Sequence, residues 1–257
     1  NCGGSTYFCI VLTRFLIDNG ADINKERIDG QTPLFSALEL GKLEIVQLLI
    51  DSGADIDKAT NEGQTPLFSA CLYGNLEVVQ MMIRNGADAD KERKGGYTPL
   101  FIASQKGYLE IVQLLVRTGV SVDKDSDNGG TPLFVGCQNG HLDIAQLLIE
   151  SEADVNKIRK DMVSPLMKSC GKGHLDIVRL LLDNGADINN AGRRGENSLS
   201  IVSEKGYLDI AQLLLDRGAD INQSLNDGAT PLFVACEKGH LDIVRLLIEK
   251  GANIDKS

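Results

Sequence analysis

The three histidines are the residues of this chain best suited to acid–base or metal chemistry, and their spacing argues against both. His141, His174 and His240 each follow a glycine and precede Leu-Asp, 33 and 66 residues apart. A zinc site needs Cys and His ligands grouped at short spacing, and no such group occurs in the sequence. We therefore interpret these histidines as structural or surface residues, and we expect no metal, no cofactor and no catalytic residue.

An acidic stretch ending at Gly129 is the second candidate for chemistry. Asp123, Asp125 and Asp127 alternate along it, as acidic residues do in calcium-binding loops. Such a loop also needs a glutamate six residues after the glycine, and Val135 stands there. No glycine-rich phosphate loop follows a predicted strand. The sequence therefore predicts a protein that is not an enzyme.

The positions of the cysteines indicate free thiols and hence a reducing compartment. Cys71, Cys137, Cys170 and Cys236 lie 33 or 66 residues apart, at equivalent positions of a 33-residue repeat. Equivalent helices pack about 8–10 Å apart, which exceeds the roughly 7 Å that a disulfide allows between Cα atoms. We expect small buried packing residues with free thiols, and hence a cytoplasmic protein.

A net charge of −10 disfavours binding to nucleic acid and to anionic membranes, and no segment predicts membrane insertion.

A unit that recurs every 33 residues organises the whole chain. The sequence Thr-Pro-Leu-Phe begins at Thr32, Thr65, Thr98, Thr131 and Thr230. Ser164-Pro165-Leu166-Met167 and Asn197-Ser198-Leu199-Ser200 fill the two gaps in the series without a change of spacing. A fixed period of this length predicts a stacked array of supersecondary units.

Each unit reads as two helices followed by an extended segment. Thr32 as N-cap and proline at the first helical position predict a short helix over Pro33–Leu40, ended by Gly41. The apolar positions of Leu43–Asp51 predict a second helix. Residues 54–63 are then extended and end in a turn. The sequence predicts an all-α solenoid of helix-turn-helix units with hairpin-like fingers.

These motifs give the chain its family resemblance. Gly-His-Leu-Asp-Ile occurs at 140–144, 173–177 and 239–243, and Gly-Ala-Asp-Ile-Asn at 20–24, 185–189 and 218–222. With the Thr-Pro-Leu starts, they resemble the ankyrin repeat over about residues 10–257. We expect a single domain over 1–257, with a degenerate partial repeat at 1–29 and seven full repeats from 30 to 257. In the partial repeat only a second helix, about Ile10–Asn19, is recognisable. Family members usually carry His after Thr-Pro-Leu; here Phe35, Phe68, Phe101, Phe134 and Phe233 predict more apolar packing between repeats.

The resemblance implies a protein-binding scaffold whose concave face is lined by the finger tips and the first helices. At those positions we predict partner-binding residues of two kinds. The apolar and aromatic ones are Leu40, Leu72, Tyr73 and Tyr97, and the basic ones are Arg159, Lys160, Arg193 and Arg194, next to Lys157. Aromatic side chains anchor protein interfaces, and a basic cluster suits an acidic or phosphorylated peptide. The alternatives are that the first set packs on neighbouring fingers and that Asp161 and Glu196 balance the second.

Two further interpretations stay open. The chain could be the substrate-recruiting arm of a larger enzyme or signalling protein. It could also be a structural array that associates end to end, since the helix over Leu241–Lys250 keeps its apolar residues. The repeats around the basic cluster also depart from the pattern, with Glu152 and Met162 at glycine positions. A non-glycine residue in the left-handed region costs roughly 1–2 kcal/mol, so the loop at Glu152 is either strained or rebuilt.

Overall fold

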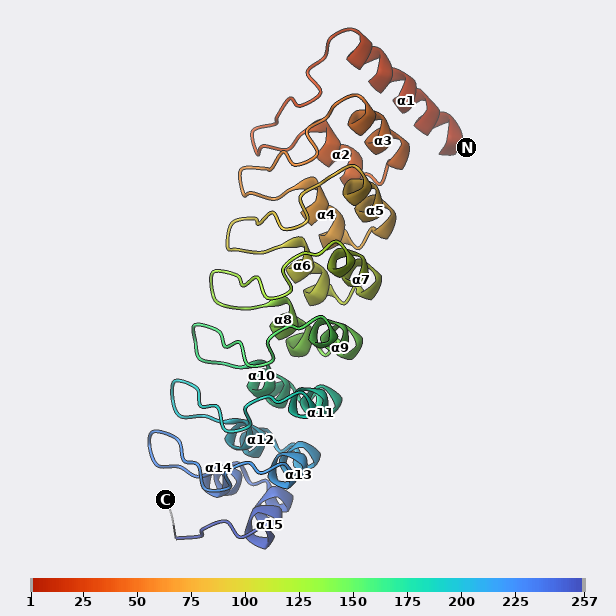
Figure 1. Cartoon of the computed structure of the whole chain (residues 1–257). Coiled ribbons are helices and arrows are strands. Elements are labelled where there is room, and N and C mark those ends of the chain that lie inside the picture. Colours follow the sequence, from red (N-terminus) through yellow and green to blue (C-terminus); the bar gives the residue numbers. More distant parts are fainter. Residues whose placement is uncertain (1, 256–257) are drawn as a thin grey trace. The chain divides into compact units, whose positions relative to one another are not determined.

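The computed structural model describes residues 2–255, and their side chains from Tyr7 onward. These residues form fifteen helices and no extended strand, as expected for an all-α repeat array. They divide into two compact units, Asn1–Ser121 and Val122–Ser257, which are described separately (Figure 1).

The first unit contains one long helix followed by three helix pairs. These are α1 (Cys2–Asp18), α2 (Pro33–Glu39) with α3 (Leu43–Asp51), α4 (Pro66–Tyr73) with α5 (Leu76–Arg84), and α6 (Pro99–Lys106) with α7 (Leu109–Arg117). The first helix of each pair packs against its partner and against the first helix of the next pair, and α1 packs against α3. The expected start of the N-terminal helix near Ile10 is wrong, because α1 begins at Cys2. Once nucleated, a helix continues through glycines at a cost of about 1 kcal/mol each.

The second unit contains four pairs built in the same way. They are α8 (Pro132–Asn139) with α9 (Leu142–Glu150), α10 (Pro165–Lys172) with α11 (Leu175–Asp183), α12 (Ser198–Lys205) with α13 (Leu208–Asp216), and α14 (Pro231–Lys238) with α15 (Leu241–Glu249). The first helices α8, α10, α12 and α14 pack in series, and each contacts its own second helix.

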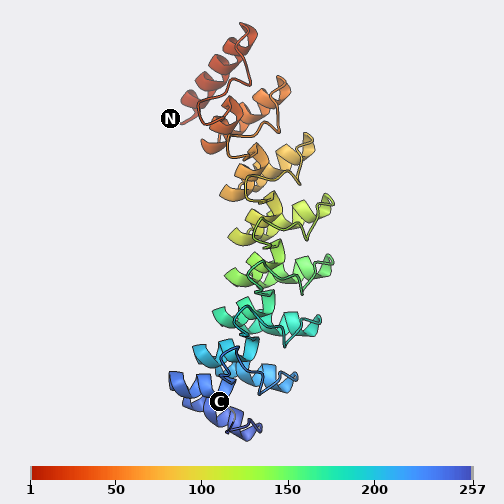
Figure 2. The ribbon, with the colours of Figure 1, turned by 90° about the vertical axis from the view of Figure 1, so that its left-hand side faces the viewer.

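In both units the loops between pairs project as fingers from the side on which the first helices lie (Figure 1); Figure 2 views the chain from that side. An Asn or Asp side chain at the base of each finger accepts a backbone N–H of the next finger. The Asp55 N–H donates to Asn24 Oδ1 at 2.8 Å, and the Asp187 N–H donates to Asn156 Oδ1 at 2.8 Å. The other acceptors are Asp57, Asp90, Asp123, Asn189 and Asn222. Within each unit the fingers are therefore fixed relative to one another.

The predicted helix starts are confirmed, including the irregular ones. The Phe68 N–H donates to Thr65 Oγ1 at 3.1 Å, and the same cap occurs at Thr98, Thr131, Ser164 and Thr230. Asn197 precedes the start without proline and forms a capping box: its Oδ1 accepts the Ser200 N–H at 2.8 Å, and its own N–H donates to Ser200 Oγ at 3.0 Å. Thr32 differs from the prediction, because its hydroxyl makes no cap bond. There the fixed φ of Pro33 starts α2 without the side-chain cap.

The apolar core follows the repeat, with exceptions in the last one. Phe35, Phe68, Phe101 and Phe134 are buried, as predicted, but Phe233 is half exposed. The cysteines divide in the same way: Cys71, Cys137 and Cys170 are buried and Cys236 is exposed. The expectation of burial is wrong for Phe233 and Cys236, because no described helix packs on that side of α14 as α14 packs on α12. Burial raises the pKa of the Cys137 and Cys170 thiols to about 12.

Two residues hold a backbone conformation that favours glycine. Glu152 has φ +69° and Met162 has φ +65°, whereas glycine occupies the equivalent positions of the other repeats. The loop at Glu152 therefore keeps the left-handed geometry and is strained rather than rebuilt.

Candidate protein-binding surface

In each unit, the finger tips and the exposed sides of the first helices form the surface on which the predicted contact residues lie; we call it the inner surface of that unit. Successive finger tips are joined by backbone hydrogen bonds. The Lys94 N–H donates to the Glu62 carbonyl and the Asn226 N–H donates to the Arg194 carbonyl. Side chains at these tips are thus presented from a backbone that is already ordered.

In the first unit, two of the four predicted apolar contact residues are largely exposed. Leu40 follows the end of α2 and is 70% exposed, and Tyr73 ends α4 and is 60% exposed. Tyr73 lines a cavity of about 560 Å³, together with Glu39 and Gly41 on either side of Leu40. Large exposed apolar side chains beside a cavity are typical of a contact site.

Leu72 and Tyr97 are less available than predicted. Leu72 is only partly exposed. The Tyr97 ring lies 4.9 Å from the Phe101 ring, between centroids, and 5.8 Å from the Arg93 guanidinium, which also covers the Phe68 ring at 5.5 Å. Tyr97 therefore takes part in packing between its finger and α6, which is the alternative that the sequence left open.

In the second unit, two members of the basic cluster serve internal contacts. The Arg159 guanidinium lies 5.2 Å from the Phe134 ring centroid and 3.3 Å from an Asp161 oxygen. The Lys157 ammonium donates to the Asp123 carbonyl at 2.6 Å and to Asp125 Oδ1 at 3.1 Å. Lys157 thus joins two fingers, and Arg159 covers a core ring.

The remaining predicted cations are exposed. The Arg193 guanidinium donates to the Lys160 carbonyl at 2.7 Å and so links two finger tips, while the Lys160 side chain stays in solvent. Arg194 lines a cavity of about 190 Å³. Its other lining residues are Glu196, Ser200, Ile201, Glu204, Leu225 and Val234. The lining thus combines charged and polar groups with apolar ones, as ligand pockets do.

Lys168 is a basic residue of this surface that the sequence reasoning missed. It lies in α10 at the position where other first helices carry Ile102, Val135, Ile201 or Val234. Burial lowers the pKa of its ammonium, and the charges of Lys172 and Arg159 lower it further, while Asp161 opposes them. A lysine in a column of mostly apolar residues was the sequence feature that could have revealed it. With Lys172 it extends the basic cluster from the finger tips to the first helix.

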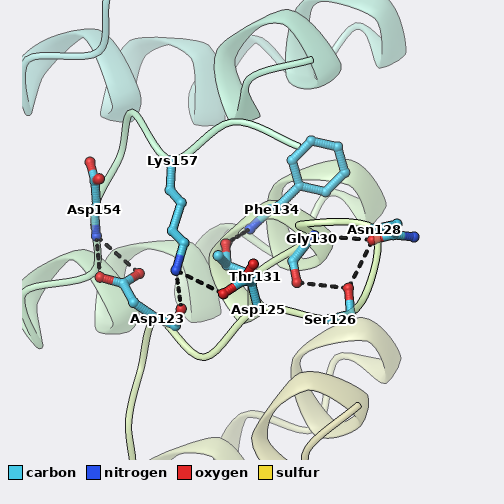
Figure 3. A network of polar contacts seen from close by, with 9 residues as sticks. All are labelled: Asp123, Asp125, Ser126, Asn128, Gly130, Thr131, Phe134, Asp154 and Lys157. Atoms are coloured by element: carbon cyan, nitrogen blue, oxygen red, sulfur yellow. Dashed lines mark hydrogen bonds and ion pairs between the residues drawn. The ribbon is translucent and has the colours of Figure 1, made fainter. Parts of the chain in front are cut away.

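The alternating acidic residues near Gly129 form a finger rather than a calcium loop (Figure 3). Asp123 accepts the Asp154 N–H at 3.0 Å, and Asp125 pairs with Lys157. Ser126 Oγ donates to Asn128 Oδ1 at 2.8 Å and closes the tip. Among the described side chains, from Tyr7 to Asp255, no group of three or more His, Cys, Asp or Glu could hold a metal ion. Within residues 2–255, no helix combines the length and apolarity needed to cross a membrane.

Comparison with known proteins covers almost the whole chain. A family model described as "Ankyrin repeats (3 copies)" matches residues 8–93, 81–159 and 157–225. A second model, described as "Ankyrin repeat", matches residues 227–257. No curated protein sequence matched the chain.

Proposed function

Because this chain belongs to the ankyrin repeat family, we propose that it is a non-catalytic scaffold that binds a protein partner on its inner surface. Ankyrin repeats are generally protein–protein interaction modules and typically lack catalytic activity. The unpaired thiols of Cys71, Cys137 and Cys170 support a reducing, cytoplasmic location.

The observation that carries this proposal is the order of the fingers before any partner binds. The Asn and Asp side chains at the finger bases bond to backbone N–H groups 31 residues later in sequence and so join successive fingers, while the side chains at the tips remain exposed. Binding then needs little further ordering of the scaffold backbone, and this lowers the entropic cost of association.

Two regions of the inner surface are suited to different contacts. Leu40 and Tyr73 offer apolar anchors in the first unit, with Leu72 and Tyr97 at their margin. Tyrosine is among the residues that contribute most to interface free energy.

In the second unit Lys160, Arg193 and Arg194 offer exposed cations above Arg159, and Lys168 and Lys172 add to them. These cations outnumber the nearby carboxylates of Asp161, Glu196 and Glu204. An acidic or phosphorylated peptide complements this charge.

The test is affinity capture from the source cell with the purified chain and two surface variants. Tyr73→Ala with Leu40→Ala should weaken capture through the apolar region, and Arg193→Glu with Arg194→Glu should weaken capture of an acidic partner. Arg179→Glu on the exposed side of α11 is the matched control and should change neither. Circular dichroism should show unchanged helicity in all three. Equal capture by every variant would refute the proposed surface.

A second candidate function, self-association, is favoured by the exposed apolar residues of the terminal helices. Tyr7 and Phe15 on α1 are 72% and 61% exposed, and Leu241 on α15 is 57% exposed. Apolar patches of this kind mark association sites. Light scattering over a range of protein concentrations separates the two functions, because a scaffold with no self-association keeps a constant mass near 27.8 kDa.

A further inference from the structure

Aromatic rings fill the space between repeats at the ends of the first helices. In the pairs named next, a Tyr or His that precedes a second helix lies against the glycine that ends the first helix of the preceding repeat. The pairs are Tyr108 with Gly74, His174 with Gly140, Tyr207 with Gly173, and His240 with Gly206. A Cβ atom added to Gly74 would lie 2.7 Å from the Tyr108 ring, and one on Gly140 would lie 2.9 Å from the His174 ring. Each ring therefore lies directly on the glycine backbone.

The histidine rings also donate a hydrogen bond at this place. His174 Nε2 lies 3.3 Å from the Gln138 carbonyl oxygen, and His240 Nε2 lies 3.0 Å from the Glu204 carbonyl oxygen. A carbonyl oxygen only accepts, so the ring N–H is the donor. Both carbonyls belong to the last turn of a first helix, where backbone acceptors have no partner within the helix.

The ring is missing between the first two full repeats. Asn75 stands where the next repeat has Tyr108, and its side chain turns to its own helix, where its Oδ1 accepts the Val78 N–H at 3.1 Å. A Cβ atom added to Gly41 would meet nothing within 4 Å. The cavity of about 560 Å³ lies here, and its lining is Leu38, Glu39, Gly41, Ala70, Tyr73, Asn75 and Val78.

We propose that this cavity binds a tyrosine or histidine side chain of the protein partner, in the place of the missing ring. The volume suits a small ligand group, and Leu38, Ala70 and Val78 offer apolar contacts to its faces. The Glu39 carbonyl is the repeat equivalent of the Gln138 and Glu204 carbonyls. Exposed Leu40 and Tyr73 stand beside the opening, where the rest of the partner segment would lie.

The charge at the cavity selects a side chain that can donate a hydrogen bond. The C-terminal end of α2 and the Glu39 carboxylate both give the opening a negative potential. A tyrosine hydroxyl or a histidine N–H complements that potential, whereas an acidic side chain is repelled. This site is thus distinct in charge preference from the basic cluster of the second unit.

The inference deepens the proposed function, and its experiment needs no partner, so the two fail separately. The probes are p-cresol and 4-methylimidazole, the side-chain analogues of tyrosine and histidine, titrated into the isotope-labelled chain and followed by amide NMR. We expect saturable shifts at Gly41, Tyr73 and Asn75 with dissociation constants on the order of a few millimolar, as fits such small ligands. Propionate, an acidic analogue, should cause none.

Asn75→Tyr supplies the ring from the chain itself and should abolish these shifts, and Asn75→His should do the same if the tyrosine variant does not fold. Glu77→Tyr adds a ring to the exposed side of the same helix and should leave the shifts as in the unmodified chain. Absence of shifts at the three amides in the unmodified chain would overturn the proposal. Shifts that persist in a folded Asn75→Tyr chain would overturn it as well.

Discussion

Replacement of Glu152 by glycine should stabilise the protein, although it removes a side chain and adds backbone freedom. Glu152 is exposed and holds φ at +69°. The strain of a left-handed non-glycine residue is about 1–2 kcal/mol, which glycine relieves. Glycine also destabilises the folded state by about 0.5–1 kcal/mol, because it increases the entropy of the unfolded chain. The expected net gain is about 0.5–1 kcal/mol. With a urea dependence of about 3 kcal/mol per molar, the unfolding midpoint should rise by roughly 0.2–0.3 M.

Two control variants test whether relief of backbone strain causes the expected stabilisation. Glu150→Gly lies two residues earlier in α9 with ordinary helical backbone, and it should destabilise the protein by about 0.5–1 kcal/mol. Gly185→Ala places a Cβ atom at the equivalent glycine of the next repeat, where it meets nothing within 4 Å, so its cost of about 1 kcal/mol measures backbone strain alone. A midpoint that falls or stays constant in Glu152→Gly would refute the reasoning.

Three further predictions concern the second unit. Asn197→Ala removes the capping box of α12 and should lower the free energy of unfolding by about 1–2 kcal/mol, measured by urea denaturation; a loss below a few tenths would contradict the role of the cap. Arg159→Ala should cost about 1 kcal/mol because its guanidinium covers a core ring, whereas Lys160→Ala should stay within about 0.5 kcal/mol, and equal effects would show that the two cations are equivalent. Iodoacetamide at pH 8 should alkylate Cys236 and spare Cys170, because burial raises the pKa of the Cys170 thiol to about 12 and keeps it protonated; mass spectrometry that finds both modified in the folded protein would contradict this.

The fold could be predicted from sequence because each repeat carries its own local instructions. Threonine or asparagine caps, proline at the first helical position and glycine after the helix fix the boundaries through backbone geometry alone. This holds even at Asn197, where the proline is missing and the capping box replaces it. A 33-residue period then places equivalent helices side by side.

The contact residues were less predictable, because their exposure depends on neighbours from other repeats. Arg159 and Tyr97 occupy positions that vary between repeats, yet the Arg159 guanidinium lies over the Phe134 ring and the Tyr97 ring packs against the Phe101 ring. The prediction that Leu40 and Tyr73 face solvent is confirmed by their exposed fractions of 70% and 60%.

The sequence shows that a ring is missing beside Tyr73, but the cavity at this place could be identified only from the structure. The column that holds Tyr108, Tyr207 and the three histidines in the later repeats has Lys42 and Asn75 in the first two full repeats. Tyr and His rings of that column lie on glycines of the preceding repeat, and this contact between repeats is visible only in the structure. Lys168 shows the same dependence on the fold, because burial lowers the pKa of its ammonium most, and the charges of Lys172 and Arg159 lower it further.

Site-specific photo-cross-linking tests the central claim, that partners bind the inner surface, most directly. A photoreactive amino acid in place of Leu40 or Lys160 should capture a protein from the source-cell extract, and the same residue in place of Glu110 or Arg179, both exposed on second helices, should not. Capture from the inner positions alone is the predicted result. Capture from the second-helix positions alone, or equally from all four, would contradict the account.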